Sequence, residues 1–160
     1  MAKELEAAKR RLGLVEGVFS AEEIYKEVRK VADKLKYSFV EKEQESKPAK
    51  YGQDRVFNFY LEKVFDDFAK GKIEIEIKFF NLNRVKVEGK ELDRGDIDFV
   101  LTATGVFDHR NEWVMKRLNK GLFDFYWKYF MKEKAKRVYL KPLTEDAEKI
   151  YEAVKGKVDR

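Results

Sequence analysis

The sequence predicts a single α+β domain over residues 1–160, with an antiparallel sheet of about four to six strands packed around a long C-terminal aromatic helix. Residues 72–79, KIEIEIKF, alternate apolar and charged side chains, as a strand with one buried face does. Residues 96–107 alternate in the same way. A one-faced sheet needs a cover, and we expect the long segment after Asn111 to provide it.

The two alternating stretches predict one long β-ribbon. Residues 88–91, EGKE, are typical of a hairpin turn. With the turn at Gly89-Lys90, residues 73–88 and 91–106 have equal length. We expect irregularities in this ribbon at Asn81-Leu82-Asn83 and at Arg94-Gly95.

Helices are predicted before and after the strands along the chain. Residues 1–19 predict an N-terminal helix and loop, because apolar residues recur there at helical spacing. Ser20-Ala21-Glu22-Glu23 is a capping box that begins a second helix, and residues 37–41 and 55–65 then predict strands around a polar loop with Pro48. Lys141-Pro142 is expected to end the aromatic helix, and residues 142–160 predict an appended C-terminal helix.

Composition excludes several classes of site. Charged residues make up 41% of the chain and there are two Gln and no Cys, a pattern typical of proteins from hot environments. The absence of Cys excludes disulfides, thiolate zinc sites and cysteine nucleophiles, and we expect a cytoplasmic location. Residues 1–13 lack the apolar stretch of a signal peptide, and no stretch is apolar enough to predict a transmembrane segment.

Positive charge is concentrated near the aromatic segment. Residues 110–141 hold ten basic and three acidic residues, a local charge of +7, while the rest of the chain carries −2. This asymmetry favours a polyanionic partner such as nucleic acid, although a solvated basic helix face explains it equally well. The candidate nucleic-acid-binding residues are Lys116, Arg117, Lys120, Lys128, Lys132, Lys136 and Arg137.

The aromatic segment has more apolar surface than one sheet can bury. On a helical wheel, the apolar side chains between Leu118 and Phe130 cover roughly 200°, whereas a surface helix needs only about 100°. Another helix of the chain, a second subunit in a homodimer, or an apolar molecule would have to cover the remainder.

From residue 20 to residue 132, the order of elements resembles the helix-grip arrangement of START-like ligand-binding proteins. Both have antiparallel strands followed by a long C-terminal helix. The resemblance rests on this order alone and on no diagnostic motif. The family usually begins with a strand, whereas helices are predicted first here. The resemblance implies a curved sheet around the helix and a hydrophobic pocket between them.

Our first hypothesis is therefore a non-enzymatic protein that binds an apolar small molecule between sheet and helix. The predicted ligand-binding residues are inward-facing and apolar, namely Phe57, Phe59, Ile75, Ile77, Phe99, Phe123 and Trp127. The first alternative is a nucleic-acid-associated protein that uses the basic helix face.

A second alternative is an enzyme with Asp108 and His109 as an acid–base pair, since this single histidine follows the last strand. A turn or cap role suits both residues better. Asp96 and Asp98 share one face of a strand, but we interpret them as solvent-facing and predict no metal and no cofactor. Nucleotide, zinc-protease and serine-hydrolase motifs are absent from the sequence.

Overall fold

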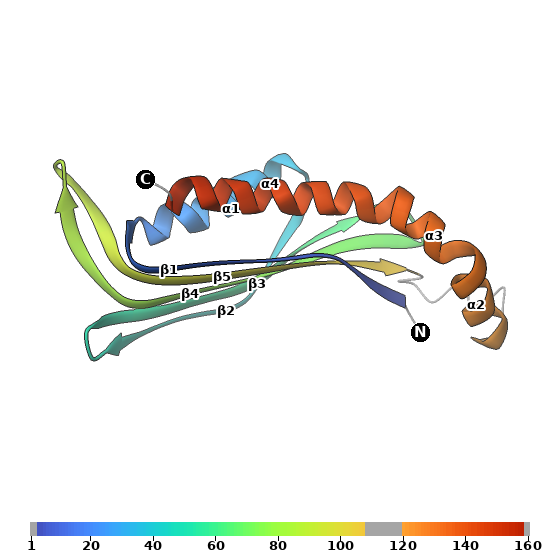
Figure 1. The fold of residues 1–160 in the computed structure, drawn as a ribbon, viewed down its shortest axis with the longest axis horizontal. Helices are drawn as coiled ribbons and strands as arrows, with labels where there is room; N and C mark the ends of the chain where they lie inside the picture. The colour runs from blue at the N-terminus through green and yellow to red at the C-terminus, as the bar shows by residue number, and fades with distance from the viewer. Residues whose placement is uncertain (1–2, 108–119, 159–160) are drawn as a thin grey trace.

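The computed structural model describes residues 3–107 and 120–158. It confirms the α+β class, with a five-stranded antiparallel sheet in the order β1-β5-β4-β3-β2 and helices on one face (Figure 1). The described elements are β1 (Lys3–Phe19), α1 (Ala21–Lys34), β2 (Ser38–Ala49), β3 (Gly52–Val64), β4 (Ala69–Val87), β5 (Lys90–Phe107), α2 (Lys120–Tyr126), the π-helical turn η2 (Trp127–Met131), α3 (Lys132–Ala135), the π-helical turn η3 (Lys136–Leu140) and α4 (Lys141–Val158).

The described N-terminal residues form strand β1, so the predicted helix and loop over residues 1–19 are wrong. β1 pairs antiparallel with β5, from Lys3 opposite Phe107 to Phe19 opposite Asp93. Leu5 and Leu12 pack against the core from this strand. Without β1, the backbone N–H and C=O groups along one edge of β5 would have no hydrogen-bond partners. Pairing with β5 therefore outweighs the helix propensity of this Ala-, Glu- and Lys-rich segment.

The β4–β5 ribbon is confirmed, with its turn one residue earlier than predicted. Val87 pairs with Lys90, and Glu88 and Gly89 form the two-residue turn with φ of 52° and 80°. A two-residue hairpin of this kind requires positive φ at both central positions. The expected irregularity is present, because the register shifts between Phe80 and Asn83.

The β2–β3 connection is tighter than predicted. Residues 46–52 were expected to form a loop around Pro48, but β2 continues to Ala49, which pairs with Gly52. Because β2 is an edge strand, Pro48 can lie in it with no cost to a central ladder.

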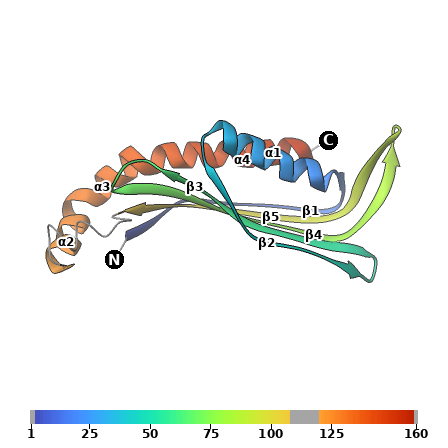
Figure 2. The same ribbon diagram turned by 180° about the vertical axis from the view of Figure 1, so that it is seen from behind.

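Helices α1 and α4 cover the inner face of the sheet, lying side by side in both views (Figures 1 and 2). The Ser20 hydroxyl accepts from the Glu23 amide at 3.3 Å, as the capping box predicts. Most of α4 comes from the helix that was predicted to be appended, and together with α1 it forms this cover. The aromatic segment, which was predicted to be the cover, lies towards one end of the sheet. The buried side chains of the two helices are Ala21, Ile24, Val28, Ala32, Leu143, Ala147, Ile150, Val154 and Val158.

Residues 120–158 are helical throughout, so the predicted break at Lys141-Pro142 is wrong. Pro142 is the second residue of α4, which begins directly after the π-helical turn η3. The π-helical turn interrupts the regular α-helical hydrogen-bond ladder just before Pro142, so the proline ring and its missing amide hydrogen fall at a local irregularity of the helix. The helical segment bends between α4 and α2, which carries α2 beyond the layer formed by α1 and α4 (Figure 1).

Candidate functional site

The structure brings the predicted ligand-binding residues of the strands together on the inner face. Phe57, Ile77 and Phe99 are consecutive partners across β3, β4 and β5. Each is at most 1% exposed, and the Phe57 ring lies 4.9 Å from the ring of Tyr25 in α1. Phe59 and Ile75 form the next row and are equally buried.

These strand residues therefore form the hydrophobic core beneath α1. Trp127 lies apart from them, with its ring 5.0 Å from that of Phe107 at one end of the sheet. The side chain of Phe123 lies outside the described part of the structure. Of these strand residues, only Ile75 borders a described pocket, which it shares with outward-facing residues of β3, β4 and β5, and another described pocket opens between α1 and β2 beside Phe39.

Part of the aromatic segment is exposed to solvent. Leu122, Phe125 and Tyr129 are 55%, 56% and 62% exposed, and we call these three side chains the aromatic patch. The rings of Phe125 and Tyr129 lie 4.8 Å apart, and the Lys128 ammonium lies 5.5 Å from the Tyr129 ring. These three side chains are thus partly exposed within the single chain, and the expectation that a second subunit or an apolar molecule covers the surplus apolar surface stays a prediction.

Six basic residues lie over residues 128–141 of the helical segment that carries the aromatic patch, and we call them the basic row. It consists of Lys128, Lys132, Lys134, Lys136, Arg137 and Lys141, of which Lys132 is half-buried and the others are exposed. The row spans about 20 Å at 1.5 Å per residue. Glu133 is the one acidic residue within it and pairs with Lys136 at 3.7 Å, so residues 128–141 carry six basic side chains against one acidic, +5.

The remaining cations of the basic row pair with no described carboxylate. Just before the row, Asp124 pairs with Lys3 of β1 at 2.5 Å, which neutralises that carboxylate. The surface of this segment is therefore positive over its whole described length. Of the predicted nucleic-acid-binding residues, Lys116, Arg117 and the side chain of Lys120 lie outside the described part of the structure. The sequence reasoning omitted Lys134 and Lys141.

Tyr139 fixes the basic row to the sheet. Its hydroxyl donates to the Asp66 carboxylate at 2.6 Å, and its ring stacks on Phe65 with centroids 6.0 Å apart. The hydrogen bond to Asp66, with a further contribution from burial, raises the pKa of Tyr139 to about 12. Leu140, 7% exposed, adds an apolar anchor in the same turn. This attachment ties the row to the connection between β3 and β4.

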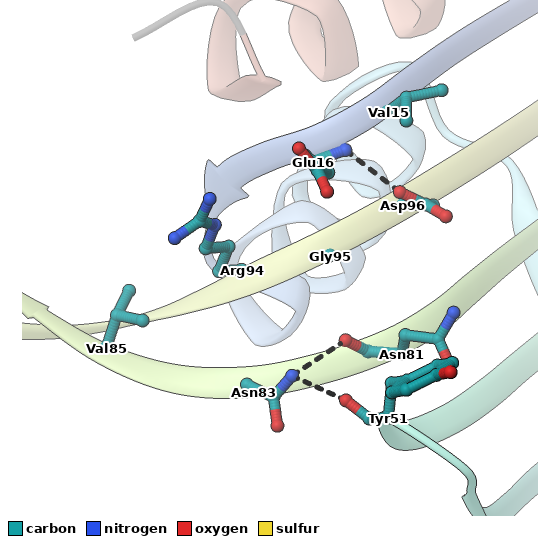
Figure 3. A pocket seen from close by; sticks show the side chains of 9 residues that line it. All are labelled: Val15, Glu16, Tyr51, Asn81, Asn83, Val85, Arg94, Gly95 and Asp96. Atoms are coloured by element: carbon teal, nitrogen blue, oxygen red, sulfur yellow. Dashed lines mark hydrogen bonds between the residues drawn. The ribbon is translucent and has the colours of Figure 1, made fainter.

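A separate pocket of about 420 Å³ lies on the outer face of the sheet, where β1, β4 and β5 bend (Figure 3). Irregularities in two strands shape it: Glu16 of β1 and Asn81 of β4 have φ of 53° and 55°. Such values are uncommon for residues other than glycine. The lining residues are Val15, Glu16, Tyr51, Asn81, Asn83, Val85, Arg94, Gly95 and Asp96.

The aspartates of β5 have structural partners. Asp93 is 8% exposed and accepts from the Ala21 amide at 2.9 Å, which caps α1 from the sheet. Asp98 accepts two hydrogen bonds from the Arg11 guanidinium, each 3.0 Å long. Asp96 accepts from the Glu16 amide at 2.9 Å. In residues 3–107 and 120–158, no three His, Asp or Glu side chains gather in a metal-binding arrangement.

The proposed acid–base pair, Asp108 and His109, lies outside the described residues, so the enzyme hypothesis stays a prediction. No described helix is long and apolar enough to cross a membrane. The sequence matches no protein-family model, and no curated protein shows significant similarity to it.

Proposed function

We propose that the protein is a non-enzymatic nucleic-acid-binding protein that holds a single strand along the basic row and stacks bases on the aromatic patch. The observation that carries this proposal is the exposure of Phe125 and Tyr129 beside Lys128. Proteins that bind single strands combine a positive track for the phosphates with exposed aromatic rings for the bases. Both parts occur here on one helical segment.

The dimensions of the basic row suit a phosphate backbone. A stacked strand rises about 3.4 Å per nucleotide along its axis, so a row of about 20 Å spans roughly six nucleotides. The five cations without a described carboxylate partner are Lys128, Lys132, Lys134, Arg137 and Lys141. Since each contacted phosphate releases condensed counterions, binding through this row depends steeply on salt.

An anionic membrane is the competing partner for a basic and aromatic surface. An interfacial helix inserts an apolar stripe along its length. Here the large apolar side chains exposed on the segment are Leu122, Phe125, Tyr129 and Val138, and only the first three gather, at one end of it. Trp127, Ala135 and Leu140 instead face inward and are at most 7% exposed. The long cationic part beyond the patch favours a linear polyanion.

The apolar-ligand hypothesis keeps one supporting observation. The described chain begins with strand β1, as START-like proteins usually do, followed by α1, four strands and a C-terminal helix. Against it, Phe57, Ile77 and Phe99 are nearly fully buried by packing alone. An apolar molecule between sheet and helix would therefore have to displace these side chains or the helices above them.

Binding of a fluorescein-labelled oligothymidylate, followed by anisotropy at low salt, tests the proposal. We expect saturable binding that unlabelled oligothymidylate competes away, and weaker binding to a duplex of the same length because its bases are already stacked. Phosphatidylserine vesicles serve as the second competitor. Absence of binding to the oligonucleotide would overturn the proposal. Complete displacement of the oligonucleotide by vesicles, with sedimentation of the protein on them, would overturn it in favour of a lipid surface.

A further inference from the structure

The pocket on the outer face of the sheet lies away from the aromatic patch. Its residues come from the bend of the strands near the β4–β5 hairpin, whereas α2 lies at the opposite end of the molecule (Figures 1 and 3). A ligand in this pocket would therefore touch neither the basic row nor the core, and the inference below is independent of nucleic-acid binding.

The pocket exists because a bulge of β4 packs tightly on β5. A Cβ on Gly95 would lie 2.7 Å from the Phe80 carbonyl oxygen and 3.1 Å from that of Asn81, closer than ordinary contacts allow. Glycine at this position lets the bulge approach, and Gly95 lines the pocket between Arg94 and Asp96. Asn83 fixes the far wall, since its side-chain amide donates to the carbonyl oxygens of Tyr51 and Asn81 at 2.7 and 3.2 Å.

Several polar side chains around this pocket have no described protein partner. The Glu16 carboxylate, the Arg94 guanidinium and the Asn81 side-chain amide form no hydrogen bond or ion pair with any described residue. Only one carboxylate oxygen of Asp96 is used, to accept from the Glu16 amide. The pocket thus offers strong donors and strong acceptors together.

The placement of these groups selects the class of ligand. Figure 3 shows the Arg94 and Asp96 side chains pointing apart from Gly95, so their charges lie on opposite sides of the pocket floor. A single anion would pair with the guanidinium alone and would be repelled by the two carboxylates. A molecule with many hydroxyl groups can donate to the carboxylates and accept from the guanidinium at the same time.

Tyr51 adds an apolar surface to this arrangement. It borders the pocket and is 68% exposed, and it is the second of the two turn residues between β2 and β3. An aromatic ring has a flat apolar face and, in tyrosine, a polar tip, which suits the C–H face and hydroxyl edge of a sugar ring. The volume of about 420 Å³ lies within the range of small-molecule pockets, roughly 300–1,000 Å³.

We propose that this outer-face pocket binds a neutral polyhydroxylated molecule, a mono- or disaccharide. The sugar hydroxyls bond to Glu16, Asp96, Asn81 and Arg94, and the ring packs on Tyr51. Binding of this kind on an open surface is weak, with a dissociation constant on the order of 1 mM.

Titration of the ¹⁵N-labelled protein with glucose, maltose and cellobiose tests this inference. We expect at least one of these sugars to shift the Gly95 amide and the Asn83 side-chain amide in a saturable way. Tyr51→Ala and Arg94→Gln each weaken that binding about tenfold, while the rest of each spectrum shows an intact fold. Both side chains are exposed, so neither change removes core packing.

The matched control is Tyr129→Ala, which removes an exposed tyrosine at the opposite end of the molecule. We expect it to bind sugar as the unaltered protein does. Failure of all three sugars to shift these resonances overturns the inference, and so do shifts that stay unchanged in Tyr51→Ala and Arg94→Gln. Since nucleic-acid binding is measured separately with oligothymidylate, either proposal can fail without the other.

Discussion

Truncating the exposed rings of the aromatic patch should reduce nucleic-acid affinity without reducing stability. Phe125 and Tyr129 are 56% and 62% exposed, so Phe125→Ala and Tyr129→Ala each remove little buried area. We expect the free energy of unfolding to change by about 0.5 kcal/mol or less, as at most surface positions. Stacking of a base on an aromatic ring contributes about 1–3 kcal/mol, so each variant should bind oligothymidylate roughly 5- to 150-fold more weakly.

Trp127 provides the control for a buried ring, because it lies between Phe125 and Tyr129 in the sequence and is only 7% exposed. Its ring packs 5.0 Å from that of Phe107, so Trp127→Ala should destabilise the protein by about 3–5 kcal/mol. Urea denaturation followed by circular dichroism gives the stability, and fluorescence anisotropy gives the affinity. Unchanged affinity in both Phe125→Ala and Tyr129→Ala would refute the stacking argument. A large loss of stability in either variant would show that the ring is buried in solution.

Three further predictions concern stability and titration. Asp93→Ala should cost about 1–3 kcal/mol in urea denaturation, because the Ala21 amide loses its buried acceptor; a change near zero would show that water replaces the carboxylate. Gly95→Ala should cost about 1–3 kcal/mol, because its Cβ would lie 2.7 Å from a backbone oxygen of β4; unchanged stability would mean that the bulge shifts freely. The pKa of Tyr139 is about 12, so its stabilisation is present below pH 10 and is lost as pH rises towards 12. Absorbance titration should show one tyrosine with its pKa lowered towards 10 in Asp66→Asn, and an identical titration in both proteins would exclude the hydrogen bond.

The sequence predicted correctly those elements that are determined by patterns among neighbouring residues. The alternation in residues 72–79 identified the centre of β4, and the capping box at Ser20 identified the start of α1. The irregularity at Asn81-Leu82-Asn83 was also predictable, because two asparagines interrupt an otherwise regular strand. These features depend on neighbouring residues alone.

Elements that depend on distant partners were predicted less well. The segment that forms β1 has the residue types of a helix, and its strand conformation follows from pairing with β5, about ninety residues away in the chain. Pro142 indicated a helix end, but it falls at the irregularity that the π-helical turn makes in a continuing helix.

The candidate sites were only partly accessible from the sequence. The basic residues of the helical segment were recognisable by charge, whereas the exposure of Phe125 and Tyr129 depends on the bend that carries α2 beyond the helical layer. The outer-face pocket is lined by residues of β1, β4 and β5. The residue pattern within one strand does not predict how three strands are placed relative to one another, so this pocket could not be predicted.

The salt dependence of oligothymidylate binding tests the central claim most directly. With five cations of the basic row contacting phosphates, the logarithm of the association constant should fall with the logarithm of salt concentration at a slope of about −3.5. In the double variant Lys134→Gln, Arg137→Gln, both exposed side chains lose their charge and the slope should fall to about −2. A slope near zero, or the same slope in both proteins, would contradict binding through this row.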